Sequence, residues 1–96
     1  MNKHLLSFVT DDDEHQVFIH VDLAGVEFLL NKLCNIKKQL EENDCPHSHL
    51  FTEEWGGEEL SSTKLASQED EQNQVHQVKI YGWNDEWKVK HKLAKL

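Results

Sequence analysis

The stretch of sequence that decides the fold is residues 22–42, DLAGVEFLLNKLCNIKKQLEE. Its apolar residues recur at the spacing of a single helical face, at Val26, Leu29, Leu30, Leu33, Ile36 and Leu40. Asp22 stands where this pattern begins and has a side chain suited to cap the free N–H groups of a first turn. Asn43 and Pro46 follow as a stop signal. The spacing therefore predicts a helix of about 30 Å over residues 23–42, long enough to cross one face of a sheet.

Short segments with strand-like alternation flank this helix. Residues 5–10 and 16–22 precede it, and segments around 49–51 and 75–83 follow it. The polar stretch 61–74 between the last two is predicted to be a loop. Strands, one long helix and then strands again predict an α+β fold, a two-layer sandwich in which one helix packs on an antiparallel sheet of about four strands.

Ninety-six residues favour a single domain, with a core over about 5–83 and a basic extension at 84–96. The predicted core joins the helix to the sheet through Val17, Ile19, Val21, Val26, Leu29, Leu30, Leu33, Leu50, Val78 and Ile80. The extension either adds a basic edge strand or forms a short amphipathic helix. Both cysteines are expected to be free thiols, Cys34 as a small core residue and Cys45 in a loop.

The charge is large and unevenly distributed. The formal net charge is −8, with −11 in residues 1–78 and +3 in residues 79–96, and all ten basic residues are lysines. Arginine is the residue best suited to form paired hydrogen bonds with guanine and with phosphate groups. Its absence from an acidic chain therefore argues against nucleic acid as a partner. An acidic surface instead favours a basic protein partner, whose approach it accelerates.

Membrane and export signals are not recognisable in the sequence. No run of about 20 apolar residues predicts a spanning helix. Residues 1–10 lack the apolar core of a signal peptide. The expected location is therefore the cytoplasm.

Histidines and carboxylates offer the candidates for chemistry. His47 and His49 point to one face of a strand, where His20 or His76 from neighbouring strands could complete a metal site. Cys45 lies too close to His47 in sequence for the usual geometry of a nucleophilic pair. Four carboxylates flank the turn Trp55-Gly56-Gly57, namely Glu53, Glu54, Glu58 and Glu59. They could act as a general acid and base, or they could simply form a solvated, negatively charged loop.

Four motifs in order carry a resemblance to a known family. They are the run 21–30 with Asp22 and Gly25, the His-Ser-His-Leu-Phe-Thr strand at 47–52, the Trp-Gly-Gly-Glu-Glu-Leu turn at 55–60, and the strand 75–81 with His76. Together they cover about two thirds of the chain, residues 16–81, and resemble the Immunity protein 32 family of bacterial polymorphic toxin systems. The resemblance implies structural roles for the motif residues Asp22, Gly25, His47, His49, Gly56, Gly57 and His76.

The resemblance further implies a non-catalytic antitoxin that binds a cognate toxin or secreted effector and requires no cofactor or metal. The expected contact surface is Trp55 with the acidic residues Glu53, Glu54, Glu58 and Glu59, and a second candidate is the acidic run Asp11, Asp12, Asp13 and Glu14. The oligomeric state is left open, with a homodimer as one option. Two alternatives remain: a small metal-binding protein or hydrolase that uses His47 and His49, and a structural module that self-associates through an edge strand or the tail.

Overall fold

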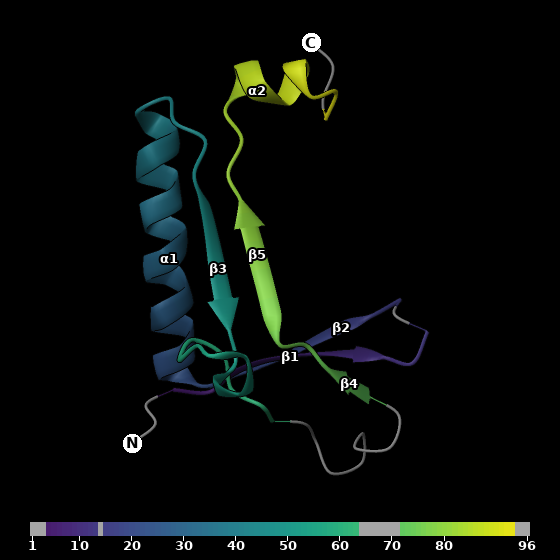
Figure 1. Ribbon diagram of the computed structural model, residues 1–96. Coiled ribbons are helices and arrows are strands. Elements are labelled where there is room, and N and C mark those ends of the chain that lie inside the picture. Colours follow the sequence, from purple (N-terminus) through teal and green to yellow (C-terminus); the bar gives the residue numbers. More distant parts are fainter. Residues whose placement is uncertain (1–3, 14, 64–71, 94–96) are drawn as a thin grey trace.

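The computed structural model describes residues 4–13, 15–63 and 72–93. Its elements are β1 (Leu6–Asp11), β2 (Val17–Val21), α1 (Leu23–Glu41), β3 (His47–Phe51), the short 3-10 helix η1 (Glu53–Trp55), β4 (Gln72–Gln74), β5 (Gln77–Tyr81) and α2 (Asp85–Lys90). Strand β1 pairs antiparallel with β2 and β4, in the order β2-β1-β4, and β3 pairs antiparallel with β5. In Figure 1 the β3–β5 pair runs alongside α1, and the three-stranded sheet extends sideways from the foot of α1.

The structure confirms the α+β class, the antiparallel strands and the packing of one helix on them. The expectation of one sheet of about four strands is wrong, because the strands divide into a set of three and a set of two. The prediction of a loop over 61–74 is also wrong at its end, where residues 72–74 form β4 against β1. Residues 64–71 of that loop lie outside the described residues.

Helix α1 begins and ends where the local signals predict. The Asp22 carboxylate accepts hydrogen bonds from Gly25 N at 2.7 Å and from Leu5 N at 2.9 Å, so it caps the helix and ties it to the start of β1. Gly25 is buried, and a Cβ atom there would overlap the Leu5 carbonyl oxygen. At the other end Asn43 takes a left-handed conformation, with φ of 66°, which asparagine tolerates better than most residues.

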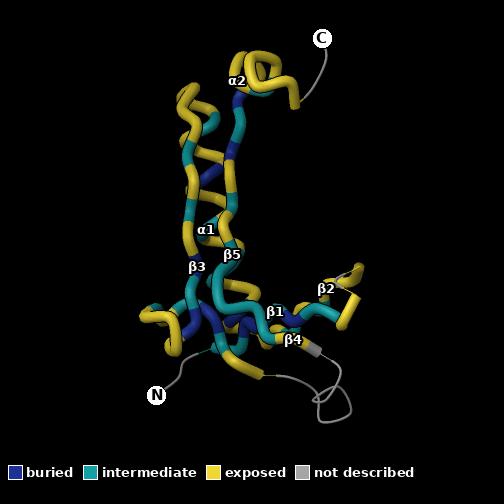
Figure 2. Tube along the Cα trace, turned by 45° about the vertical axis from the view of Figure 1, so that its right-hand side comes forward, coloured by how far each residue is buried: buried dark blue, intermediate teal, exposed yellow. Residues whose placement is uncertain are grey.

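The main hydrophobic cluster lies at the corner where the two sheets meet α1, and Figure 2 shows buried segments there and also farther along α1, where Ile36 is buried near Gly82. Leu6, Leu50 and Leu60 form its centre. Partly buried side chains pack against that centre, namely Phe8, Phe28, Leu29, Val78 and Ile80. The core predictions for Leu29, Leu50, Val78 and Ile80 are therefore confirmed.

The rest of the predicted core is exposed. Val17, Ile19, Val21, Val26, Leu30 and Leu33 are 39–60% exposed. Helix α1 packs on the β3–β5 pair through the side that carries Phe28 and Leu29, and of its apolar stripe only that half is covered. The prediction that Cys34 belongs to the core is wrong for the same reason, because it lies on an exposed side of α1. Cys45 is exposed, and both cysteines are free thiols.

The C-terminal extension forms the helix alternative, α2, over Asp85–Lys90. Asn84 caps it by accepting a hydrogen bond from Trp87 N at 2.9 Å, and its amide donates to Asn43 O at 3.1 Å. This side chain therefore ties the start of α2 to the end of α1.

Candidate partner-binding surface

The segment between β3 and Leu60, here called the acidic turn (residues 53–59), is held in shape by its backbone. Thr52 O accepts hydrogen bonds from Trp55 N and Gly57 N at 3.0 and 2.9 Å. Gly56 adopts φ of 93°, a left-handed conformation that favours glycine, and a Cβ atom on Gly57 would press on Phe51. The two glycines of the Trp-Gly-Gly motif are therefore required by the shape of the turn.

The indole of Trp55 is supported on one side and open on the other. It stacks on the His76 ring, with centroids 5.3 Å apart and planes 2° apart, yet Trp55 is 59% exposed. His76 is held in turn, because its Nδ1 lies 2.7 Å from the hydroxyl of the fully buried Thr52. A large aromatic ring with a fixed orientation and an open face is the type of group that anchors protein interfaces.

The four carboxylates of the acidic turn divide into two roles. Glu53, Glu54 and Glu58 are exposed and surround Trp55 in sequence. Glu59 is different, because its Oε1 accepts a hydrogen bond from Phe51 N at 2.9 Å and closes the turn on β3. Of the predicted contact residues in this segment, the structure therefore presents Trp55 and three carboxylates to solvent and uses the fourth to hold the scaffold.

Glu54 is kept ionised by a neighbouring hydroxyl. The Ser62 hydroxyl donates a hydrogen bond to its Oε1 at 2.6 Å, and this bond lowers the pKa of the Glu54 carboxyl below its ordinary value. A general acid at neutral pH requires the opposite shift. Glu54 is therefore suited to attract a cation and poorly suited to donate a proton.

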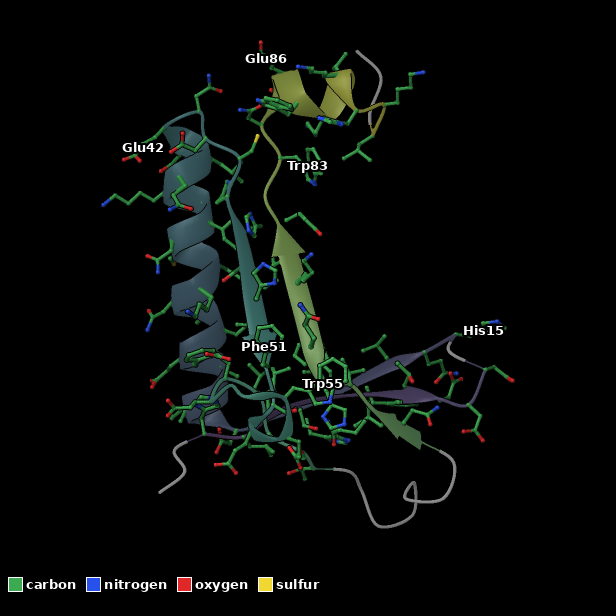
Figure 3. The ribbon with its side chains drawn as sticks, viewed as in Figure 1. His15, Glu42, Phe51, Trp55, Trp83 and Glu86 are labelled. Carbon is green, nitrogen blue, oxygen red and sulfur yellow. The ribbon has the colours of Figure 1, made fainter. Side chains whose placement is uncertain are left out.

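The second predicted patch, the acidic run in the β1–β2 loop, lies elsewhere. Asp11 Oδ1 accepts hydrogen bonds from His15 N and Gln16 N and so organises the loop, while Asp12 and Asp13 are exposed. Glu14 lies outside the described residues. Figure 3 shows His15 at the far tip of the hairpin, well away from Trp55, so the two acidic patches do not form one surface.

Next to the acidic turn, the β3–β5 pair presents a face rich in rings to solvent. The register opposes His47 to Tyr81, His49 to Lys79 and Phe51 to Gln77, and these six residues form what is here called the outer face. Adjacent rings are in contact: Phe51 and His49 are stacked at 6.1 Å, His49 and His47 meet edge to face at 5.1 Å, and His47 lies 6.3 Å from Tyr81.

Rings continue past the end of β5 into the C-terminal extension. Tyr81 lies 6.3 Å from Trp83, Trp83 lies 5.4 Å from His91, and His91 stacks on Trp87 at 5.2 Å. Figure 3 shows Phe51 and Trp55 at one end of the β3–β5 pair and Trp83 beyond the other. The outer face thus links the acidic turn to the tail by a line of rings.

Sequence reasoning missed Phe51, Lys79, Tyr81 and Trp83 as surface candidates. The signal was present in the alternation of the two strands, in which every second residue of 47–51 and 77–81 is a ring, a lysine or a glutamine. Only the pairing register shows that these residues share one exposed face. Tyr81, a large aromatic side chain on this face, is 53% exposed.

The histidines and cysteines do not gather into a metal centre. His47 and His49 contact each other, but His20 lies on β2 in the other sheet and His76 is bonded to Thr52. Within residues 4–13, 15–63 and 72–93, no three His, Cys, Asp or Glu side chains are grouped to hold a metal ion. The metal-binding alternative therefore has no complete ligand set in this part of the chain.

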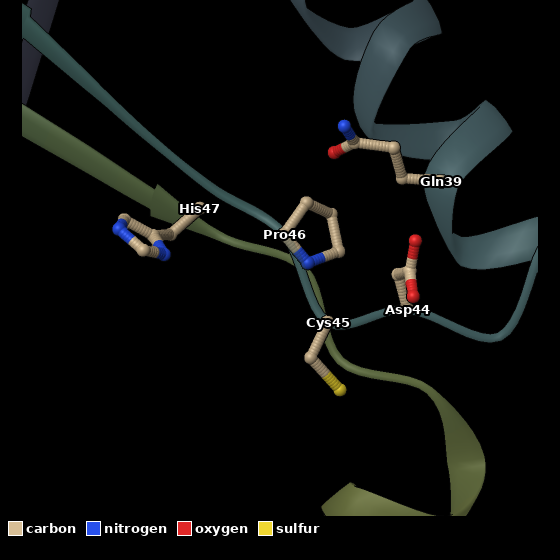
Figure 4. A pocket seen from close by; sticks show the side chains of 5 residues that line it. All are labelled: Gln39, Asp44, Cys45, Pro46 and His47. Carbon is tan, nitrogen blue, oxygen red and sulfur yellow. The ribbon is translucent and has the colours of Figure 1, made fainter.

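A shallow hollow of about 380 Å³ beside Cys45 does not assemble a nucleophilic pair either. It is lined by Gln39, Asp44, Cys45, Pro46 and His47. Figure 4 shows the Cys45 thiol and the His47 ring pointing in different directions. His47 is therefore not placed to act as the base that would activate this thiol.

The sequence matches no protein-family model, and neither a curated protein nor a solved structure is similar enough to count as a match. The resemblance to the Immunity protein 32 family therefore stays a prediction that depends on its four motifs. Among the described residues, no helix is both long and apolar enough to cross a membrane.

Proposed function

We propose that this chain is an immunity protein that binds and neutralises a cognate bacterial toxin in the cytoplasm. The observation that carries the proposal is Trp55, which is fixed against His76 and still 59% exposed in the middle of an acidic turn. A tryptophan whose orientation is fixed before association and which becomes buried on association is a frequent anchor of protein interfaces.

The charge of the turn indicates the sign of the partner. Exposed Glu53, Glu54 and Glu58 carry negative charge around the indole, in a chain with net charge −8. Carboxylates at the rim of an interface accelerate encounter with a positively charged protein and select against negatively charged ones. A toxin that acts on nucleic acid carries a basic cleft, and the acidic turn fits the charge of such a cleft.

The outer face supplies further contact area beside the acidic turn. Trp55 and the turn alone are smaller than a standard interface, which takes about 800 Å² from each partner. Tyr81 and the two histidines of β3 extend the surface with rings that lose little conformational freedom on binding. We assign Trp55 as the anchor, the three carboxylates as the steering charges and the outer face as the flank.

Binding to the toxin encoded next to this gene tests the proposal. Calorimetry with the purified toxin domain should give a stable one-to-one complex, and the association rate should fall as salt is added, because rim charges act at long range. Tyr81→Ala should weaken the complex less than Trp55→Ala. Failure to bind the neighbouring toxin, or a complex indifferent to Trp55→Ala, contradicts the proposal.

A further inference from the structure

Strand β2 is an edge strand with an open side. Among the described residues its only strand neighbour is β1. Hydrogen bonds at the two ends of the pair run from Asp11 N to Gln16 O and from Asp22 N to Leu5 O. Backbone groups alternate in direction along an antiparallel pair, so the N–H and C=O groups of Val17, Ile19 and Val21 point away from β1. Within the part of the chain that the structure describes, these three residues therefore offer a row of donors and acceptors that no other strand pairs.

This edge lacks the features that normally prevent strand pairing. Native edges are protected by charged residues, proline or bulges, and the sequence of β2, VFIHV, contains no charge and no proline. Its apolar side chains continue into a groove of about 130 Å³ between β2 and α1, which is lined by Ile19, Val21, Val26, Leu29, Leu30 and Leu33. The edge and the groove form one uncovered apolar surface.

The strand is complementary to itself. If two copies pair antiparallel with Ile19 on the twofold axis, Val17 lies opposite Val21 of the second copy, and Phe18 lies opposite His20. The outward groups of residues 17, 19 and 21 then face one another and are satisfied. Just outside the strand, Asp22 lies opposite Gln16 of the second copy, so no two like charges meet along the seam.

The pattern of exposure shows which element of the second copy covers the surface. Val17, Ile19 and Val21 are 60%, 50% and 39% exposed, so α1 covers only the Val21 end of its own strand. Figures 1 and 2 show β2 extending away from the foot of α1. A twofold axis at Ile19 reverses this order and brings α1 of the second copy toward Val17, the most exposed end.

The uncovered area also fits a second copy. Five residues of strand are too few for a stable interface of about 800 Å² per partner, but the uncovered side of α1 adds Val26, Leu30 and Leu33.

We infer that this protein forms a homodimer through antiparallel pairing of β2 with β2 of a second copy, with Ile19 at the twofold axis. The three-stranded sheets join into one sheet in the order β4-β1-β2-β2-β1-β4, and the two α1 helices lie on the same face of it. The inference does not depend on the proposed toxin binding, because the acidic turn and the outer face lie outside this seam.

Sedimentation velocity of the full chain without any toxin tests the dimer. For wild-type protein at micromolar concentrations, the molar mass obtained from sedimentation should be twice the 11.3 kDa mass of one chain. Ile19→Lys places a charge on the axis and should give monomer. Leu30→Lys alters α1 and should weaken the dimer at least tenfold. Tyr81→Lys is the matched control, since Tyr81 is as exposed as Ile19 but lies on the outer face, and it should leave the dimer intact.

Amide exchange and circular dichroism separate loss of pairing from loss of folding. Wild-type protein should protect the amides of Val17, Ile19 and Val21, and Ile19→Lys should expose these three while the circular dichroism spectrum is unchanged. A wild-type monomer overturns the inference. A dimer that survives both lysine variants in β2 and α1, or that is lost in Tyr81→Lys, overturns it as well.

Discussion

Trp55 lies flat on His76, with ring planes 2° apart, and the Nδ1 atom of His76 lies 2.7 Å from the Thr52 hydroxyl oxygen. Trp55 belongs to η1, His76 directly precedes β5, and Thr52 directly follows β3. A buried hydroxyl thus positions an imidazole, and the imidazole positions an exposed indole. The orientation of the proposed anchor is therefore set by a residue that the partner does not need to touch.

Removing the anchor and removing its support should have different effects. Trp55→Ala should change the free energy of unfolding by less than about 1 kcal/mol, since the ring is largely exposed, but weaken toxin binding by about 2 kcal/mol or more. His76→Ala removes a hydrogen-bond partner of the buried Thr52 hydroxyl and should cost about 1–3 kcal/mol of stability. Urea unfolding and calorimetry measure the two effects. Equal losses of stability in both variants would contradict this assignment.

Asp22 makes stability depend on pH in the acid range. Hydrogen bonds from the Leu5 and Gly25 amides lower the pKa of its carboxyl in the folded state. A lowered folded pKa adds stability above the unfolded value of about 4, and this contribution disappears as the pH falls through the folded value. Thermal unfolding of Asp22→Asn, which keeps an oxygen for capping, should depend less on pH below about 5 than that of wild type. If the melting temperatures of Asp22→Asn and wild type changed equally with pH, this account would be contradicted.

The cap itself is tested by a second substitution at the same residue. Asp22→Ala removes the acceptor for both amides and should lower the melting temperature at neutral pH more than Asp22→Asn does. Circular dichroism at 222 nm during heating measures both variants. An identical melting temperature for the two would show that the capping oxygen is not what stabilises α1.

Two glycines should respond to alanine for different reasons. Gly25→Ala places a methyl group on the Leu5 carbonyl, a backbone atom that cannot rotate away, and should cost about 3 kcal/mol or more. Gly56→Ala meets no atom within 4 Å, and its cost of about 1–2 kcal/mol comes from φ of 93° alone. Denaturant unfolding of both variants checks the order. A larger loss at Gly56 would contradict the close approach of β1 and α1.

Alanine substitutions at neighbouring glutamates of the acidic turn should have different effects, some on the stability of the fold and others on the rate of association with the toxin. Glu59→Ala leaves Phe51 N without its acceptor and should cost about 1–3 kcal/mol of stability. Glu53→Ala and Glu58→Ala should change stability by no more than about 0.5 kcal/mol, but slow association with the toxin and reduce its dependence on salt. Stopped-flow mixing at several salt concentrations measures the rates. An unchanged salt dependence in the Glu53 and Glu58 variants would remove these residues from the interface.

Features governed by neighbouring residues in sequence were predictable. The ends of α1 follow from Asp22 and Asn43, and the shape of the acidic turn follows from Gly56 and Gly57, because caps and turns depend on local backbone geometry. Strand β4 escaped prediction, since residues 72–74 are Gln-Asn-Gln and carry no apolar alternation. It is defined by hydrogen bonds to β1, more than sixty residues earlier, which no local pattern reveals.

The sequence by itself determined that the chain is an acidic α+β domain with one long amphipathic helix and a Trp-Gly-Gly turn surrounded by carboxylates. It did not determine which side of that helix would be covered. The side of α1 that packs against the core carries Leu29, which is partly buried, whereas Leu30 and Leu33 on the neighbouring side stay exposed. Hydrophobic periodicity shows which residues favour burial, but only the arrangement of the other elements decides what is available to bury them.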